Sequence, residues 1–364
     1  MKQTPNEGKI RAQSEALSGI VDPLLSWYDR NARILPWREE PTPYRVWISE
    51  IMLQQTRVEA VKPYFERFVS ALPGVCDLAR VPDDQLMKLW EGLGYYSRAR
   101  NLKKAAGVLM ERYGGALPAS FDALLTLPGI GSYTAGAVAS IAYGLPVPAV
   151  DGNVLRVVSR LLASEEDILK PIVKKTVERS LTAVLPKDRP GDFNQALMEL
   201  GATVCLPNGV ALCERCPVQG CCKAHREGRV MELPVKAKKK PRREEERTVL
   251  LLFCEGKAAV RQREQKGLLA GLWELPNVEG RLAPVEVEEQ LEEWGFSGAR
   301  AEPLFDAKHI FSHIEWHMTG YAAYVREERT ANGLIWVTKE QLAREIALPS
   351  AFRAYTEELF RRLP

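Results

Sequence analysis

The sequence predicts a two-domain protein with a mostly helical N-terminal region and an α+β C-terminal domain. Residues 10–225 carry apolar residues at helical spacing, in short segments separated by Pro and Gly. Residues 232–247 (ELPVKAKKKPRREEER) are polar and charged without an apolar face, which is typical of an interdomain linker. Beyond this segment, β-branched and aromatic residues appear in the pattern of strands, with a hairpin expected around Glu255-Gly256, and helical patterns follow at 285–295 and 338–361. These three patterns along one chain indicate two folding units.

Length, charge and the N-terminal residues narrow the class of protein. A chain of 364 residues, of which 46% are hydrophobic and 27% charged, is long enough for two ordinary globular domains. The segment MKQTPNEGKIRAQ has no apolar run of signal-peptide length, and no stretch approaches the roughly 18 apolar residues of a membrane span, so we expect an intracellular protein. Residues 1–247 have a net charge of +7 and residues 248–364 of −4, which mildly favours a polyanionic partner.

A helix with a carboxylate beside its apolar face is predicted near residue 50. Thr42 and Pro43 form a helix start, with a hydroxyl N-cap and Pro at the first helical position. An apolar stripe follows at helical spacing: Tyr44, Trp47, Ile48, Ile51 and Met52. Glu50 lies beside this stripe, where desolvation would keep its carboxyl protonated and suit it to act as a general acid. From this segment alone, a solvated glutamate on the helix surface is the more common outcome.

Residues 120–143 predict two short helices joined by a tight glycine turn. Ser120 can cap the first helix, LPGIG forms the turn, and Ser132 begins the second helix. Gly129 and Gly131 would leave backbone N–H groups uncovered at a helix N-terminus, and such groups can hold a phosphate without reading base sequence. A helix–hairpin–helix of this kind favours DNA binding.

A second carboxylate, Asp151, follows an apolar loop that contains Pro and precedes an amphipathic helix. It can serve as the N-cap of that helix. At the mouth of a cleft it would also face the positive charge that develops when a glycosidic bond breaks. One protonated and one ionised carboxyl are the usual equipment for cleaving such bonds. Glu50 and Asp151 are therefore the candidate catalytic pair.

Five of the seven cysteines crowd into residues 205–222. Four of them are separated by seven, two and five residues: Cys205, Cys213, Cys216 and Cys222. Cys221 could compete as the fourth ligand. A tight cluster in a chain without a secretion signal indicates a metal site, either zinc or a cubane iron–sulfur cluster, and the spacing leaves both open. Cys76 and Cys254 are isolated, and we expect them in the core.

These motifs together resemble the MutY family of adenine DNA glycosylases, within the helix–hairpin–helix superfamily that includes endonuclease III. The resemblance extends from about Leu24 to Phe360 and rests on the cysteine run and five segments: LPWR (35–38), WISEIMLQQT (47–56), EGLGYYSRARNL (91–102), LPGIGSYTAGAV (127–138) and VDGNVLRV (150–157). It implies an all-α glycosylase region at 1–231, a linker at 232–247 and a Nudix-like domain at 248–364. Within the first region it implies a six-helix barrel at about 30–145 and a cluster subdomain formed by the N-terminal helix and about 146–231.

The resemblance implies roles for individual residues. Glu50 would protonate the adenine leaving group, and Asp151 would stabilise the sugar cation. Tyr133 occupies the position where bifunctional relatives carry a nucleophilic lysine, which implies hydrolysis without a Schiff base, and Asn153 would position catalytic groups or water. The other implied contacts are Trp37 and Arg38 in the adenine pocket, Gln55 and Tyr95 as wedges in the duplex, Leu53 and Thr56 near the opposite base, and Gly129 and Gly131 on the DNA backbone.

The resemblance also implies a [4Fe–4S] cluster as cofactor, held by Cys205, Cys213, Cys216 and Cys222. In the family this cluster shapes a DNA-binding loop and is not the catalyst. The commonest family spacing has six residues between the first two ligands, and this chain has seven.

The C-terminal domain resembles the Nudix-like domain with which the family recognises 8-oxoguanine. Residues 288–296 (EEQLEEWGF) echo the core of a Nudix box, but Glu replaces its arginine and Gly280 replaces its upstream glutamate, so we do not expect a pyrophosphatase. The pattern of residues 309–318 (HIFSHIEWHM) predicts one strand with three histidines on one face, for which metal binding is a minor alternative: His309, His313 and His317. By resemblance, the loop that meets 8-oxoguanine is Phe311-Ser312-His313, and partly buried strand residues are the alternative.

The expected function is that of a monofunctional DNA N-glycosylase of base excision repair. It would remove adenine opposite 8-oxoguanine or guanine after flipping it out of the duplex, because a stacked base is unreachable. Double-stranded DNA is the expected partner, and we expect a monomer that does not contact a membrane. The expected location is the cytoplasm and, in a bacterium, the nucleoid. Tyr133 and the second domain argue against a bifunctional endonuclease III-like lyase. The pair of carboxylates argues against a DNA-binding protein without activity.

Overall fold

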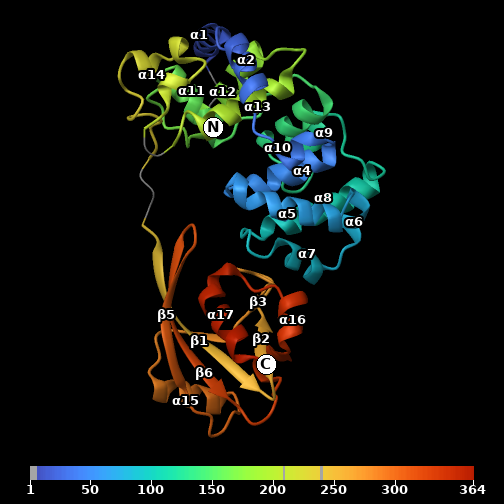
Figure 1. The fold of residues 1–364 in the computed structure, drawn as a ribbon, viewed down its shortest axis with the longest axis vertical. Coiled ribbons are helices and arrows are strands. Elements are labelled where there is room, and N and C mark those ends of the chain that lie inside the picture. The colour runs from blue at the N-terminus through green and yellow to red at the C-terminus, as the bar shows by residue number, and fades with distance from the viewer. Residues whose placement is uncertain (1–5, 208–209, 238–240) are drawn as a thin grey trace. The chain divides into compact units, whose positions relative to one another are not determined.

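The computed structural model describes residues 6–207, 210–237 and 241–364. The chain forms two compact units, one from residues 1–80 and 100–238 and the other from residues 81–99 and 239–364 (Figure 1). The predicted fold class is confirmed, because helices build the first unit and a sheet with helices on both faces builds most of the second. Within the described ranges, no helix combines the length and apolar character needed to cross a membrane.

In the first unit, the N-terminal helices share a core with helices that come more than a hundred residues later. This group consists of α1 (Glu7–Ser18), α2 (Val21–Asn31), α11 (Gly152–Leu161), α12 (Pro171–Val184) and α13 (Pro190–Thr203). Its core includes Leu17, Leu24, Val154 and Phe193, all fully buried. Two 3₁₀ turns, Cys213–Arg215 and Gln219–Cys221, and α14 (Lys223–Arg226) follow. Several cysteines of the cluster pack against this core, which anchors the cysteine loop.

The other helices of the first unit are α3 (Pro36–Glu39), α4 (Pro43–Leu53), α5 (Val58–Ala71), α6 (Val75–Arg80), α8 (Ser97–Arg112, whose first residues belong to the second unit), α9 (Phe121–Leu125), α10 (Ser132–Ala137) and a π-helix (Val138–Ala142). As predicted, α4 begins after Thr42, whose side chain accepts a hydrogen bond from Arg45 N, and its whole apolar stripe is buried. The π-helix was not predicted; π-turns occur often at functional sites. A Cβ at Gly136 would stand 2.3 Å from Pro148 O, so only Gly lets α10 approach the segment that leads to Asp151.

The second unit is built around a mixed sheet. Its strands are β1 (Arg243–Cys254), β2 (Lys257–Gln262), β3 (Trp273–Glu274), β4 (Asn277–Glu279), β5 (Glu302–Ile310), β6 (Ile314–Tyr324) and β7 (Leu334–Val337). The order is β3-β2-β1-β6-β5, with β4 on β1, β7 on β2, and β1 parallel to β6. The predicted hairpin turns at Glu255 and Gly256, which both have positive φ.

Two apolar layers cover this sheet. The helices of the second unit are α7 (Asp83–Trp90), α15 (Pro284–Glu293), α16 (Lys339–Arg344) and α17 (Arg353–Arg362), with 3₁₀ turns at Ala331–Gly333 and Ser350–Phe352. Residues of α15 pack on one face of the sheet, and residues of α16 and α17 pack on the other (Figure 1). The helical patterns expected after residues 285 and 338 are thus present, the second of them interrupted between α16 and the turn at Ser350.

The linker predicted at 232–247 is too long at both ends. Leu233 is only 2% exposed, and Val235 O accepts a hydrogen bond from Ile168 N. At the other end, β1 already begins at Arg243, because its charged residues pair with β6 from Ile314 onward. Local composition cannot reveal a partner so distant in the chain. Residues 238–240 of the linker lie outside the described residues.

The single strand predicted at 309–318 is wrong. β5 ends at Ile310 and β6 begins at Ile314, so the segment folds back on itself, and Phe311 N donates to Ile314 O at 2.8 Å. β-Branched and aromatic residues lie on both sides of the turn, which is why the pattern reads as one strand. His309 and His317 therefore lie on paired strands, with His313 in the turn between them.

Candidate active site

Glu50 is buried in α4, with 5% of its surface exposed, so the alternative of a solvated surface glutamate is wrong. Tyr133, in the first turn of α10, donates its hydroxyl hydrogen to Glu50 Oε2. Burial raises the pKa of Glu50 to about 7, although the Tyr133 bond opposes this shift. Burial also raises the pKa of Tyr133 well above its usual value, so the phenol remains a donor. At neutral pH, Glu50 can therefore hold a proton that it is able to give away.

Asp151 is the N-cap of α11. Its Oδ1 accepts from Val154 N at 2.8 Å and its Oδ2 from Asn153 Nδ2 at 2.7 Å. Burial raises the pKa of Asp151, while these donors and the charge of Arg156 favour the anion. The negative charge of Asp151 in turn raises the pKa values of both Glu50 and Tyr133. The charge of Asp151 thus acts on Glu50, so the two predicted carboxylates lie within one site.

A chain of hydrogen bonds leads from Asp151 to the first cysteine of the cluster. Asn153, bonded to Asp151, accepts from Arg156 Nη2 at 2.9 Å, and Arg156 Nε donates to Cys205 O at 2.9 Å. Arg156 is 5% exposed and also donates to Gly201 O. Sequence reasoning missed this residue. The available signal was an arginine on a helix whose neighbours are apolar.

Arg38, predicted in the adenine pocket, is bound by the protein itself. Its guanidinium donates to Gln195 Oε1 at 3.0 Å, to Arg33 O at 3.1 Å and to Glu199 Oε2 at 2.9 Å. Glu199 is 1% exposed, also pairs with Arg33, and has a lowered pKa because these two arginines outweigh its burial. The charge of Arg38 lowers the pKa of Glu50, so it lies near the site. Sequence reasoning missed Glu199, which is a lone carboxylate in the apolar segment ALMELGA.

Trp37, the other residue assigned to the adenine pocket, is 6% exposed and packs edge-on against Phe65, with 5.4 Å between ring centroids. Most of its surface is therefore used by the core. Only a small part of the indole remains for a ligand.

The two residues predicted to enter the duplex both have left-handed backbones. Gln55, after the end of α4, has φ of 60° and is exposed, and Leu53 and Thr56 beside it are half-buried. Tyr95, in the second unit, has φ of 47° and is 46% exposed. Positive φ in residues other than Gly is uncommon and often marks a functional turn. Gln55 lies in a tight turn that is closed by the bond from Thr56 N to Leu53 O at 3.3 Å.

The helix–hairpin–helix has the predicted form. Ser120 caps α9 by accepting from Ala123 N, and Gly131 is the N-cap of α10. Gly129 has φ of 77°, and a Cβ there would stand 2.6 Å from Asn101 Cβ, so both backbone and space require Gly. Gly131 is extended and has open space around it, so no comparable constraint acts there. Both glycines are exposed, while Ile130 between them is buried.

The four predicted cysteine ligands line one small cavity: Cys205, Cys213, Cys216 and Cys222. Arg160 Nη1 approaches Cys205 Sγ at 3.2 Å. Burial raises the pKa values of three of these thiols, that of Cys216 to about 12, and charge on the neighbouring thiols adds to the shift. Cys221 instead directs its thiol to Gly19 O at 3.6 Å and does not line the cavity. Asn208 and Gly209, in the longer first interval, lie outside the described residues.

In the second unit, Ser312 and His313 are exposed in the turn between β5 and β6, and Phe311 is half-buried. Near this turn, ligand atoms of Glu244, Glu315 and His317 lie within 4.8 Å of one another. Lys308 forms an ion pair with Glu315 there, so the ammonium group of Lys308 already takes the place that a metal ion would need beside this carboxylate. The predicted alternative of a three-histidine metal site receives no support from this arrangement.

Two families match the chain: the HhH-GPD superfamily base excision DNA repair proteins at residues 48–186 and the NUDIX domain at residues 248–358. The adenine DNA glycosylase of Rattus norvegicus is 35% identical over 399 residues, covering 92% of this chain and 77% of the rat protein. The chain belongs to the adenine DNA glycosylase family. It is therefore a DNA glycosylase of the base excision repair type, as predicted from the sequence.

Solved structures agree with this membership. A thermostable thymine-DNA glycosylase is 29% identical with a TM-score of 0.54, over 59% of this chain and 99% of that chain. A non-covalent complex of endonuclease III with DNA is 25% identical with a TM-score of 0.51, over 59% of this chain and 97% of that chain. DNA is thus the expected partner of an adenine DNA glycosylase with this fold.

Proposed function

We propose that the chain hydrolyses the glycosidic bond of adenine opposite 8-oxoguanine or guanine, without forming a Schiff base. The observation that carries this proposal is the buried Glu50, with a pKa of about 7, bonded to Tyr133 and within the electrostatic reach of Asp151. It supports a protonated and an ionised carboxyl acting on one nucleotide, which has left the stack to become accessible.

In this mechanism, Glu50 donates its proton to the leaving adenine as the glycosidic bond breaks, and Asp151 faces the sugar that becomes cationic. A water molecule then adds to the sugar cation and returns a proton to the Glu50 carboxylate, which completes the hydrolysis. Tyr133 holds Glu50 in place through Oε2 and bears no amine that could attack the sugar. Asn153 orients the Asp151 carboxylate, and Arg156 orients Asn153. Proton donation lowers the cost of expelling adenine, and the fixed anion stabilises the cation as it forms.

Adenine release from matched duplexes tests this function. Under single-turnover conditions, we expect fast release when adenine lies opposite 8-oxoguanine, slower release opposite guanine and none above background opposite thymine. We expect only a weak covalent adduct in borohydride, because Tyr133 stands where a lysine would be needed. A strong adduct that forms as fast as base release would instead establish a lyase of the endonuclease III kind.

We further propose that Cys205, Cys213, Cys216 and Cys222 hold a [4Fe–4S] cluster. Four sulfurs around one cavity, with an arginine directed at one of them, are a suitable donor set for it. When bound, the cluster would supply cationic iron that keeps the four thiolates together. The Arg156 bond to Cys205 O would then join a fixed loop to the Asn153–Asp151 pair.

Two adjacent cysteines provide a matched test of this ligand set. Cys222→Ser should lose iron and sulfide, because Cys222 lines the cavity, whereas Cys221→Ser should retain both. Iron, sulfide and zinc are measured on protein purified without oxygen. Wild-type protein that contains zinc and no iron would rule out the cluster. Loss of iron only in Cys221→Ser would show that Cys221, and not Cys222, is the fourth ligand.

The turn at Phe311-Ser312-His313 is the proposed reader of 8-oxoguanine, because it exposes a hydroxyl and an imidazole. Both groups can form hydrogen bonds that distinguish an oxidised from an unmodified guanine. A monomeric state and a cytoplasmic location remain predictions.

A further inference from the structure

The turn between β5 and β6 is attached to its surroundings through its backbone. Phe311 N donates to Ile314 O at 2.8 Å, and Arg243 N donates to His313 O at 3.1 Å. The side chain of Arg242 adds a bond from Nε to Phe311 O at 3.1 Å. Ser312 and His313 stay exposed while the ends of the turn are held, and the hydroxyls of Ser312 and Tyr95 lie 3.1 Å apart.

The side chain of Phe311 connects this turn to the core. Its ring meets Trp316 edge to face, with 5.0 Å between centroids and 76° between planes. Trp316 is 1% exposed and also packs against Phe352 at 5.9 Å. A shift of the Trp316 ring would therefore displace Phe311 and the two polar residues that follow it.

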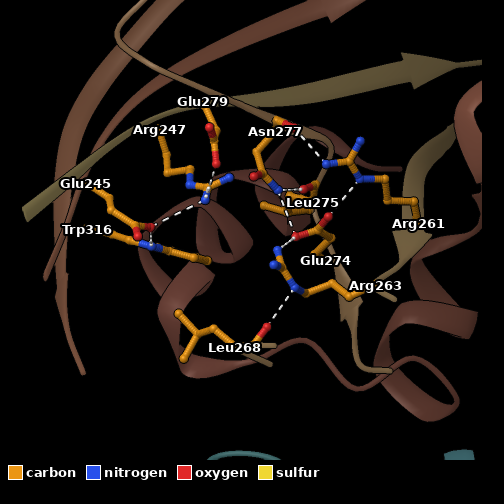
Figure 2. Close-up of polar contacts among 10 residues, drawn as sticks. All are labelled: Glu245, Arg247, Arg261, Arg263, Leu268, Glu274, Leu275, Asn277, Glu279 and Trp316. Atoms are coloured by element: carbon orange, nitrogen blue, oxygen red, sulfur yellow. Dashed lines mark hydrogen bonds and ion pairs between the residues drawn. The ribbon is translucent and has the colours of Figure 1, made fainter. Parts of the chain in front are cut away.

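Trp316 is held by charged groups rather than by apolar packing alone. Its Nε1 donates to Glu245 Oε2 at 2.9 Å (Figure 2). The guanidinium groups of Arg247 and Arg263 lie 5.2 Å and 5.9 Å from its ring centroid. Cations at these distances are attracted by an indole ring, and more strongly where water is excluded.

Arg263 is in turn fixed by a buried carboxylate. Its Nη1 bonds to Glu274 Oε2 at 2.5 Å and its Nε to Leu268 O at 2.9 Å (Figure 2). Glu274 is 2% exposed and also accepts from Arg261 Nε at 2.7 Å and from Asn277 Nδ2 at 2.9 Å. A carboxylate surrounded by these donors is held in one orientation, and its bond to Arg263 Nη1 fixes the position of the Arg263 guanidinium.

We propose that Trp316 and the Arg263–Glu274 pair are positioning residues for the turn at Phe311-Ser312-His313, and that they set how well the enzyme prefers 8-oxoguanine to guanine. The inference rests on the proposed role of that turn. It assigns a function to two buried residues, Trp316 and Glu274, and to the arginine that joins them. Substitutions in this network should therefore reduce the preference for 8-oxoguanine over guanine without slowing base excision.

The chain offers a closely matched pair of substitutions. Arg263→Lys and Arg261→Lys each replace one guanidinium on Glu274, and each loses one bond to a backbone carbonyl. Of these two arginines, Arg263 lies over the Trp316 ring and Arg261 does not. A general loosening of the domain should affect both variants alike, whereas an effect through Trp316 should appear only in Arg263→Lys. Trp316→Phe tests the ring itself, since it removes the Nε1 donor.

The experiment measures single-turnover adenine release by the full chain, opposite 8-oxoguanine and opposite guanine, and takes the ratio of the rates. We expect Arg263→Lys and Trp316→Phe to lower this ratio about fivefold, on the scale of one partly solvated cation–π contact, with the rate opposite guanine unchanged. Arg261→Lys should change the ratio less than about twofold. Thermal unfolding of each variant verifies that it is folded.

His313→Ala separates this proposal from the one on which it rests. If His313→Ala lowers the ratio while Arg263→Lys and Trp316→Phe leave it unchanged, the positioning role is refuted and the role of the turn stands. An equal effect of Arg263→Lys and Arg261→Lys would also refute positioning through Trp316. If His313→Ala and Ser312→Ala leave the ratio unchanged, the turn does not recognise the base, and both proposals fall.

Discussion

Glu50→Gln should lower the single-turnover rate of adenine release by about 10³-fold or more, while the affinity for the duplex changes little. Glutamine keeps the size of the side chain and can still accept the Tyr133 hydrogen bond, but it has no acidic proton to donate. Loss of a positioned general acid costs roughly 10²- to 10⁴-fold, and adenine is a poor leaving group without its proton. The rate and the equilibrium dissociation constant are measured on the same duplex.

Although Glu50→Gln should slow base release, it should stabilise the folded protein, by an amount that depends on pH. Burial raises the pKa of Glu50 from 4.5 to about 7, so the folded protein binds a proton that the unfolded chain has lost. The contribution of this proton is complete below about pH 4.5 and is lost as the pH rises through 7. Near pH 8, Glu50→Gln should therefore be more stable than wild type, by up to about 3 kcal/mol, and the gap should close in acid.

Glu59→Gln is a suitable control, because Glu59 is exposed on the neighbouring helix α5. It should leave base release, binding and unfolding unchanged. If Glu50→Gln impairs binding as much as base release, and lowers stability at every pH, Glu50 holds the fold rather than the proton.

Asp151→Asn should lower the rate of base release by about 10²- to 10³-fold, the scale expected when one fixed charge is removed from a developing ion. Asparagine is as good a helix N-cap as aspartate and can still accept from Val154 N. Stability should therefore change little, which separates the catalytic charge from the capping role. Rates come from single-turnover assays and stability from thermal unfolding.

Asp151→Ala is the matched variant, because it removes both the charge and the cap. It should show the same loss of rate together with a loss of about 1 kcal/mol in stability. A fully active Asp151→Asn protein would show that the sugar cation needs no anion at this position. The capping role would then be the whole function of the residue.

Features with local causes were predictable from the sequence. The start of α4 follows from Thr42 and Pro43, and the cap of α11 follows from Asp151. The hairpin at Glu255 and Gly256 likewise depends on adjacent residues. In each case the physical signal lies within about one helical turn or one β-turn of the residue concerned. The burial of Glu50 did not follow in this way, because its segment alone favours a solvated side chain.

The features that were missed depend on partners far away in the chain. Arg156 bonds to Cys205 O, and Arg33 and Arg38 both bind Glu199, and none of these pairs shares a local pattern. The start of β1 at Arg243 likewise depends on pairing with β6. The close approach at Gly136 becomes evident only once Pro148 is placed beside it. Buried polar residues of this kind look like ordinary surface charges until the fold surrounds them.

The central claim is that Glu50 delivers the proton on which adenine release depends. The most direct test is the pH dependence of single-turnover release in wild type and in Glu50→Gln, on adenine opposite 8-oxoguanine. The wild-type rate should fall as the pH rises through about 7, because the carboxyl then loses its proton. The small residual rate of Glu50→Gln should show no such fall. A decline at the same pH in both proteins would mean that another group supplies the proton.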